Sequence, residues 1–106
     1  MRRDVIKNHL ELLVLTALKA GPGHGYSIIR AIRDRSDGEF ELLEGSLYPA
    51  LHRLERDSLV TSSWSEVAGR KRRVYKLSRR GRAALEEQER DWRRFQRAMN
   101  LVLADR

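Results

Sequence analysis

The chain has 106 residues, a formal net charge of +7, 41% hydrophobic and 35% charged residues, and no cysteine. This length fits one domain with a modest core, and the lack of cysteine excludes disulfides, thiolate metal sites and cysteine nucleophiles. The three histidines, His9, His24 and His52, are far apart in sequence and lie near no suitable group of carboxylates. We therefore expect neither a metal site nor a cofactor.

The positive charge is concentrated in one part of the chain. Residues 1–45 and residues 83–106 are each neutral, whereas residues 46–82 hold ten basic and three acidic residues, which accounts for the whole excess of +7. A neutral–basic–neutral distribution is typical of a protein that docks one anionic partner at one place.

The first predicted helix spans residues 9–20 and ends at the sequence Gly21-Pro22-Gly23, which cannot continue a helix. Its apolar run, residues 12–18, is too short to span a bilayer and has no cleavage site. We therefore expect a buried core helix, a cytoplasmic protein and no membrane partner.

A second helix is predicted over residues 25–35, with apolar side chains at spacings of three and four. Packing is favoured over phosphate contact for Tyr26. Residues 36–38 end this helix, and residues 40–42 are too few for a helix and are compatible with a small strand.

The third predicted helix spans residues 46–57. It carries one apolar stripe, formed by Leu47, Ala50, Leu51 and Leu54. Pro49 is compatible with this helix only if the helix begins near Ser46, because a proline in the first turn removes no intrahelical hydrogen bond.

The next segments predict a β-hairpin, with strands over residues 59–66 and 72–77 and a turn over residues 67–71 that contains Gly69. Ser78 then caps a long helix that runs to about Leu103. This last helix has a heptad-like seam with steps of three and four residues: Leu85, Gln88, Trp92, Phe95, Met99 and Val102. So short a chain has no room to bury this seam alone, which favours a homodimer with Leu85, Trp92, Phe95, Met99 and Val102 as dimerisation residues.

This element order predicts a mainly α fold with a β-hairpin wing (α+β). Residues 1–78 form a winged helix-turn-helix DNA-binding domain, and residues 79–106 form a C-terminal dimerisation helix in the same structural unit. In this fold the third helix enters the major groove of DNA. Its outer face and the wing, residues 66–77, supply the predicted DNA-binding residues: Ser46, Tyr48, Pro49, His52, Arg53, Arg70, Lys71, Arg72 and Arg73.

Two segments carry a specific resemblance. The sequence LYPALHRLERDSLV at residues 47–60, followed by GRKRRVYKLSRRG at residues 69–81, resembles the PadR family of bacterial transcriptional regulators, and Gly25-Tyr26 fits it too. The single C-terminal helix resembles the small subfamily, which includes a multidrug-responsive repressor. The resemblance implies a homodimer, held by the last and first helices, that binds a double-stranded operator with dyad symmetry. Such a regulator is usually a repressor and is released by a ligand or stress signal.

Two positions depart from the family pattern. Ser58 stands where the family usually has glycine after the third helix. A serine in a left-handed cap should cost about 1 kcal/mol relative to glycine. The wing lacks the usual proline and has gained charge, which should loosen its tip and strengthen its attraction to phosphates.

Trp92 has two interpretations. In one, it packs the dimer seam. In the other, which the resemblance to the multidrug-responsive repressor implies, the Trp92 side chains of the two subunits face each other across a cavity at the dimer interface. There they stack an aromatic small-molecule effector, and Leu12 and Thr16 also line the cavity. An alternative function is a ligand-sensing or protein-interaction dimer with only weak, nonspecific DNA binding. An enzyme is not expected, because the sequence has no paired catalytic carboxylates, no Gly-rich phosphate loop and no nucleophile motif.

Overall fold

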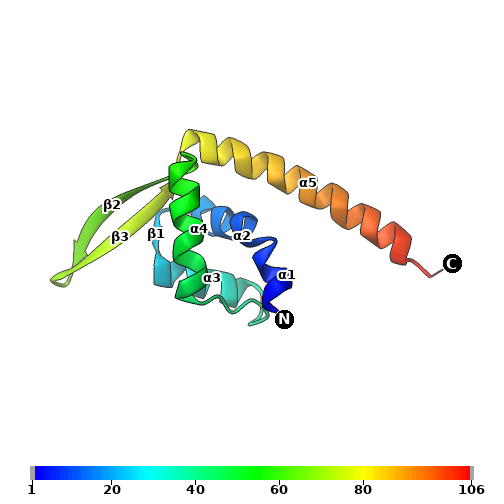
Figure 1. Ribbon diagram of the computed structural model, residues 1–106, viewed down its shortest axis with the longest axis horizontal. Coiled ribbons are helices and arrows are strands. Elements are labelled where there is room, and N and C mark those ends of the chain that lie inside the picture. Colours follow the sequence, from blue (N-terminus) through cyan, green and yellow to red (C-terminus); the bar gives the residue numbers. More distant parts are fainter. Residues whose placement is uncertain (1, 106) are drawn as a thin grey trace.

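A computed structural model describes residues 2–105 of the chain. Within this range the backbone forms five helices and one three-stranded antiparallel sheet (Figure 1). In chain order the elements are α1 (Arg3–Lys7), α2 (Leu10–Lys19), β1 (Gly23–His24), α3 (Gly25–Arg35), α4 (Glu44–Arg56), β2 (Val60–Val67), β3 (Arg70–Leu77) and α5 (Arg79–Leu103). The expected α+β fold with a hairpin wing and a long C-terminal helix is therefore confirmed.

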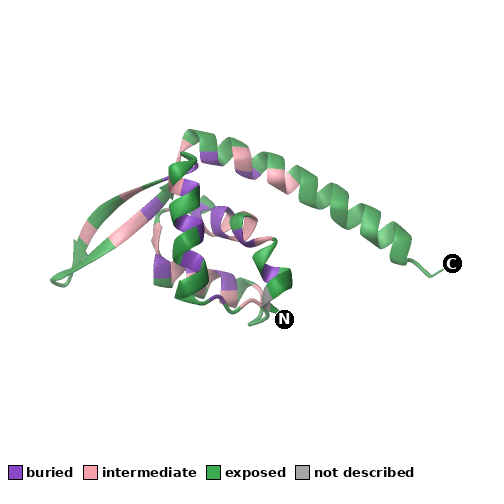
Figure 2. Cartoon of the chain, viewed as in Figure 1, coloured by how far each residue is buried: buried purple, intermediate pink, exposed green. Residues whose placement is uncertain are grey.

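The core lies where α2, α3 and α4 meet and continues onto the base of the wing (Figure 2). The predicted apolar stripe of α4 is buried, and it packs with the apolar faces of α2 and α3. Val60, Tyr75 and Leu77 extend this core onto the sheet. The outer half of α5 extends away from this body and is exposed along its length. In the described part of the chain, no helix has the combination of length and apolar character that crossing a membrane requires.

Two short elements differ from the prediction. The expected strand at residues 40–42 is wrong, because these residues belong to no strand. Phe40 instead donates its N–H to Ser36 Oγ at 3.0 Å. The sheet gains its third strand from Gly23 and His24, which pair with Tyr75 and Val74 of β3. This strand directly precedes α3 and so attaches the start of α3 to the wing.

Helix α4 begins at Glu44, two residues before the predicted start. Pro49 therefore lies inside the helix, and the prediction that it occupies the first turn is wrong. Because proline has no N–H, the carbonyl of Gly45 loses its usual helical partner. Pro49 is exposed, so this gap lies on the outer side of the helix and leaves the buried stripe intact.

The wing is longer and its turn tighter than predicted. Only Ala68 and Gly69 separate the two strands, with φ values of 53° and 75°. Positive φ at both central residues is typical of the type I′ turn, which fits the twist of a two-residue hairpin. Strand β3 consequently begins at Arg70, and the four consecutive cations lie on this strand and alternate between its faces.

The end of α4 and the start of α5 are joined by one compact junction. Ser58 has φ 63°, as predicted, and the N–H of Leu59 bonds to the carbonyl of Leu54 at 2.8 Å in a Schellman cap. Ser78 caps α5 by accepting the N–H of Gly81 at 2.9 Å, and its hydroxyl donates to the carbonyl of Ser58 at 2.6 Å. A Cβ on Gly81 would lie 1.9 Å from the carbonyl oxygen of Leu59. Only glycine therefore allows this approach of the two helix ends.

The cap at Ser58 generates a stability prediction. Ser58→Gly should raise the free energy of unfolding by about 1 kcal/mol, because glycine adopts positive φ without a Cβ clash. Urea denaturation measures this change. Ser63→Gly is the matched control, since Ser63 is an exposed residue in the middle of β2, and that change should lower stability. Equal destabilisation by both variants would contradict the cap assignment.

Candidate nucleic-acid interface

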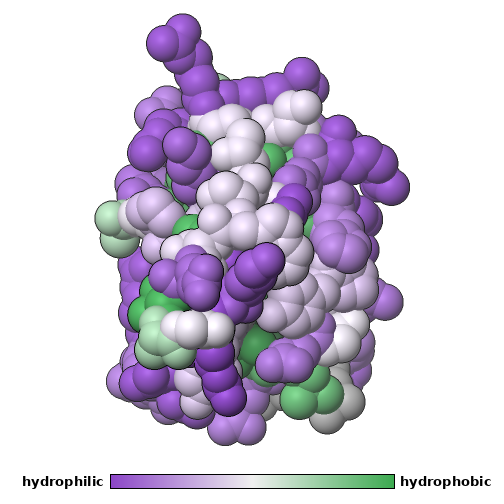
Figure 3. Space-filling model, turned by 90° about the vertical axis from the view of Figure 1, so that its left-hand side faces the viewer, coloured by the Kyte–Doolittle hydropathy of each residue, from purple (hydrophilic) through white to green (hydrophobic). Residues whose placement is uncertain are grey.

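The exposed side of α4 carries the polar residues predicted from the sequence. Its buried side faces the core, and the outer side exposes an imidazole, hydroxyl groups and the two guanidinium groups of Arg53 and Arg56. Groups of these kinds form hydrogen bonds with phosphates and base edges. The wing end of the molecule is predominantly hydrophilic (Figure 3). The five α4 residues predicted to bind DNA are all exposed, namely Ser46, Tyr48, Pro49, His52 and Arg53.

Tyr48 is positioned by a close contact with α3. A Cβ on Gly25 would lie 2.3 Å from the Tyr48 hydroxyl oxygen, so the absence of a side chain at Gly25 allows the ring to lie over the start of α3. The tyrosine remains 36% exposed. Gly25 therefore allows α3 to pack closely against α4. The Tyr48 hydroxyl then lies at the edge of the exposed α4 face.

The wing cations fall on two opposite faces. Lys71 and Arg73 pair across the strands with Glu66 and Trp64, and these four residues share the face that continues from the core. Arg70 and Arg72 lie on the other face. A single phosphate therefore cannot be reached by all four cations at once, although the narrow wing tip allows both faces to approach a groove.

Arg73 connects the wing to α4. Its guanidinium lies 3.9 Å from Glu55 Oε2 and 5.1 Å from the centre of the Trp64 ring. The same Glu55 oxygen accepts a hydrogen bond from the Ser62 hydroxyl of β2. Glu55 thus contacts both wing strands, and Arg73 is held between a carboxylate and an aromatic face. The importance of Glu55 was not evident in the sequence, because only the hairpin register brings it to the wing.

Arg72 is held on the opposite face by His24. The two side chains approach to 3.0 Å between the Arg72 guanidinium and His24 Nε2. His24 also caps α3, since its Nδ1 accepts the N–H of Ser27 at 3.3 Å while Ser27 Oγ accepts the N–H of His24. Partial burial, and secondarily the positive charge of Arg72, lower the pKa of His24 below its ordinary 6.5.

Helix α3 contributes two exposed residues that sequence reasoning assigned to packing or did not consider. Tyr26 is 56% exposed, and the Arg30 guanidinium lies 5.8 Å from the centre of its ring. Their i, i+4 spacing on the helix was the available signal. Together with α4 and the wing, they extend the polar surface across α3. No cluster of histidine and acidic residues suited to a metal ion occurs among residues 2–105.

The predicted dimerisation residues of α5 separate into two groups. Leu85 is buried in the core of its own chain. The outer positions are exposed and form one apolar seam, Trp92, Phe95, Met99 and Val102. Leu101 and Leu103, which the heptad spacing did not include, are also exposed.

Within one copy of the chain, the three predicted ligand-binding residues line no common cavity among the described residues, and the predicted cavity between two copies stays a prediction. Trp92 packs against His9, with ring centres 5.3 Å apart, and against Phe95 at 5.8 Å. Thr16 lines a cavity of about 220 Å³ between α2 and α3, to which neither Leu12 nor Trp92 contributes. Trp92 therefore lies where α5 meets His9, the residue that precedes α2, and it exposes 38% of its surface.

Residues 14–87 match the profile of the transcriptional regulator PadR-like family. A transcriptional regulator from Clostridium thermocellum superposes with a TM-score of 0.87 at 26% identity, covering 95% of this chain and 99% of that one. A PadR family transcription regulator from Clostridium difficile R20291 is 32% identical, with a TM-score of 0.80 and coverage of 91% and 99%. The fold is also that of Bacillus subtilis PadR, whose structure holds operator DNA, with a TM-score of 0.68, 20% identity and coverage of 74% and 45%.

The His24–Arg72 contact generates a pH prediction. Because the folded state lowers the pKa of His24, the unfolded chain takes up a proton more readily, and stability falls as the pH drops through 6.5 toward the lowered pKa. His24→Asn keeps a capping acceptor and removes the titration, so it should lose less stability between about pH 7.5 and about pH 5. Urea unfolding at the two pH values measures this. His52→Asn, at an exposed histidine, should behave as wild type; a His24→Asn variant with wild-type pH dependence would contradict the prediction.

Proposed function

This chain belongs to the PadR-like family of transcriptional regulators, which are not enzymes, and we propose that it is a repressor that binds a dyad-symmetric operator as a homodimer. The observation that carries this proposal is the exposed polar face of α4 beside a wing with four consecutive cations, Arg70–Arg73. The positive charge of the chain is concentrated around these two elements. Since the partner is chromosomal DNA, the protein acts in the cytoplasm.

Each element has a separate role in the proposed complex. Helix α4 enters the major groove, where His52, Arg53 and the hydroxyls of Ser46 and Tyr48 face base edges or flanking phosphates. The wing neutralises phosphates, and its arginines suit a narrow minor groove. Bacillus subtilis PadR, which has the same fold, is in complex with operator DNA, and this supports DNA as the partner.

The outer half of α5 joins the two copies. Its seam of Trp92, Phe95, Met99 and Val102 repeats at heptad spacing and is exposed, although His9 covers part of Trp92. A second copy packed on this seam buries the apolar side chains, whereas Leu85 remains in the core of its own chain. Residues 1–78 and 79–106 then act as one unit, because the Ser58–Ser78 junction connects α4 to α5.

A small-molecule effector at the dimer interface would release the operator by changing the separation of the two α4 helices. The exposed part of Trp92 supports an aromatic effector, and the same surface supports the alternative of a sensing dimer with weak DNA binding. Selection of binding sites from a random DNA pool distinguishes the two. Recovery of a palindrome is expected, and recovery of no preferred sequence would contradict repression through an operator.

The wing generates a prediction about salt dependence. Replacing Arg70, Lys71, Arg72 and Arg73 with alanine should weaken binding to all DNA sequences alike. It should also flatten the slope of log K against log salt by about 0.9 for each phosphate that the variant no longer neutralises. Fluorescence anisotropy at several salt concentrations measures both effects.

A matched control removes the same charge elsewhere. The arginines on the side of α5 away from the seam are all exposed, namely Arg90, Arg93, Arg94 and Arg97. Their replacement by alanine should leave the salt slope unchanged. If the wing variant kept full affinity, or if the control flattened the slope as much, the wing would not be the element that binds phosphates.

The seam generates a prediction about assembly. Phe95→Glu places an unpaired carboxylate in the proposed interface, which should cost more than about 3 kcal/mol of dimer stability. The variant should sediment as a monomer and lose operator affinity. Asn100→Glu, an equal change in charge off the seam, should remain dimeric. A Phe95→Glu variant that still sediments as a dimer would exclude this interface.

A further inference from the structure

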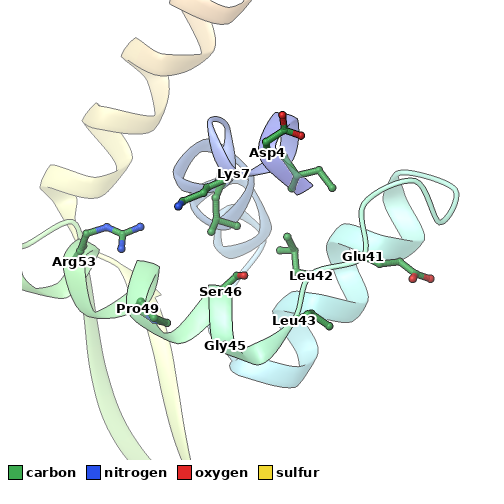
Figure 4. Close-up of a pocket in the computed structure, with 11 residues that line it drawn as sticks. Asp4, Lys7, Glu41, Leu42, Leu43, Gly45, Ser46, Pro49 and Arg53 are labelled. Atoms are coloured by element: carbon green, nitrogen blue, oxygen red, sulfur yellow. The ribbon is translucent and has the colours of Figure 1, made fainter. Parts of the chain in front are cut away.

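A cavity of about 560 Å³ lies between α1, the loop before α4 and one side of α4 (Figure 4). Its volume falls within the range of small-molecule sites, about 300–1,000 Å³. None of the seam residues of α5 lines this cavity, so it is distinct from the effector site proposed at the dimer interface. It borders the proposed DNA-reading surface, because Ser46, Pro49 and Arg53 line it.

Two cations close one end of the cavity. Lys7 at the end of α1 and Arg53 on α4 direct their charged groups toward one another (Figure 4). The carboxylates of Asp4 and Glu41, although they line the cavity, point away from this end, and Asp4 is paired with Arg2 at 2.8 Å. Neither Lys7 nor Arg53 takes part in an ion pair with another described residue. An anion between them would relieve their mutual repulsion and accept charge-assisted hydrogen bonds from both.

The apolar lining of the cavity favours a ligand with an aliphatic chain. Its apolar lining is aliphatic and includes Ile6, Leu10, Leu42 and Leu43, and no aromatic side chain belongs to it within the described residues. Figure 4 shows Leu42 directed into the cavity from the loop before α4. An aliphatic chain gains free energy by covering these side chains, whereas a flat aromatic ring finds no stacking partner here.

We infer that this cavity binds a small aliphatic carboxylate, with its headgroup between Lys7 and Arg53 and its chain over the leucines. A bound carboxylate engages Arg53 and lies beside Ser46 and Pro49. If the proposed function holds, the ligand and DNA compete for the same side of α4. This competition needs no change in the separation of the two copies.

The binding test uses the full chain without DNA, so its outcome does not depend on the proposed function. Isothermal titration calorimetry with octanoate should give one site per chain, whereas octylammonium, which has the same chain length and the opposite charge, should not bind. Lys7→Met keeps the apolar stem and should weaken octanoate binding about tenfold, the loss expected for one charge-assisted hydrogen bond. Lys19→Met is the matched control on α2, outside the cavity, and should bind octanoate as wild type does.

The competition test adds DNA. Octanoate should lower the affinity of wild type for a selected operator. The reduction in operator affinity should be much smaller for the Lys7→Met variant. Octanoate binding by a chain that binds no operator would overturn the proposed function and leave the site intact. Absence of octanoate binding would overturn the inference. So would equal binding of octylammonium, or a Lys7→Met variant that loses DNA affinity but not octanoate affinity, because Lys7 would then be a phosphate contact.

Discussion

The end of α4 and the start of α5 approach each other closely, and this contact sets how the helices of the molecule are arranged. Ser58 takes a left-handed conformation, its carbonyl accepts the Ser78 hydroxyl, and Gly81 lies against the Leu59 carbonyl. This junction fixes the angle between the helix that carries the reading face and the helix that carries the seam. Two copies joined through α5 would therefore hold their α4 helices at a set separation, as recognition of paired half-sites requires.

Contacts on both faces of the wing hold it against α4 and the start of α3. Glu55 on α4 contacts Ser62 and Arg73 on one face, and His24 at the start of α3 contacts Arg72 on the other. These contacts hold the side chains of Arg72 and Arg73 in place. Arg70 and Lys71, which are nearest the tip, are exposed. A surface built in this way is preorganised, so less conformational entropy is lost when it meets a rigid duplex.

Elements with strong local signals were predictable from the sequence. The bounds of α3 agree with the prediction, and α5 runs to Leu103 after the Ser78 cap as expected, because periodicity and capping residues specify both helices.

Features that depend on contacts between distant parts of the chain were not predictable. β1 was missed because two residues have no periodicity, and their pairing with Tyr75 and Val74 is a tertiary contact. The start of α4 was placed too late because Pro49 was assumed to lie in the first turn. The contact between Glu55 and Arg73 could not be predicted from the sequence, because it depends on the register of the β2–β3 hairpin, which the two-residue turn sets. The cavity beside Arg53 depends on α1, which no sequence signal predicted.

Changing the spacing between the two half-sites of an operator tests whether α5 holds the two α4 helices at a fixed separation. An operator selected from a random pool is compared with the same operator carrying a half-turn insertion of about five base pairs at its centre. A rigid dimer joined through α5 predicts that the insertion reduces affinity to that of nonspecific DNA, and that an insertion of a full turn restores part of the loss. Equal affinity for all three sites would show that the two reading helices are not held at a fixed separation, and would contradict this account.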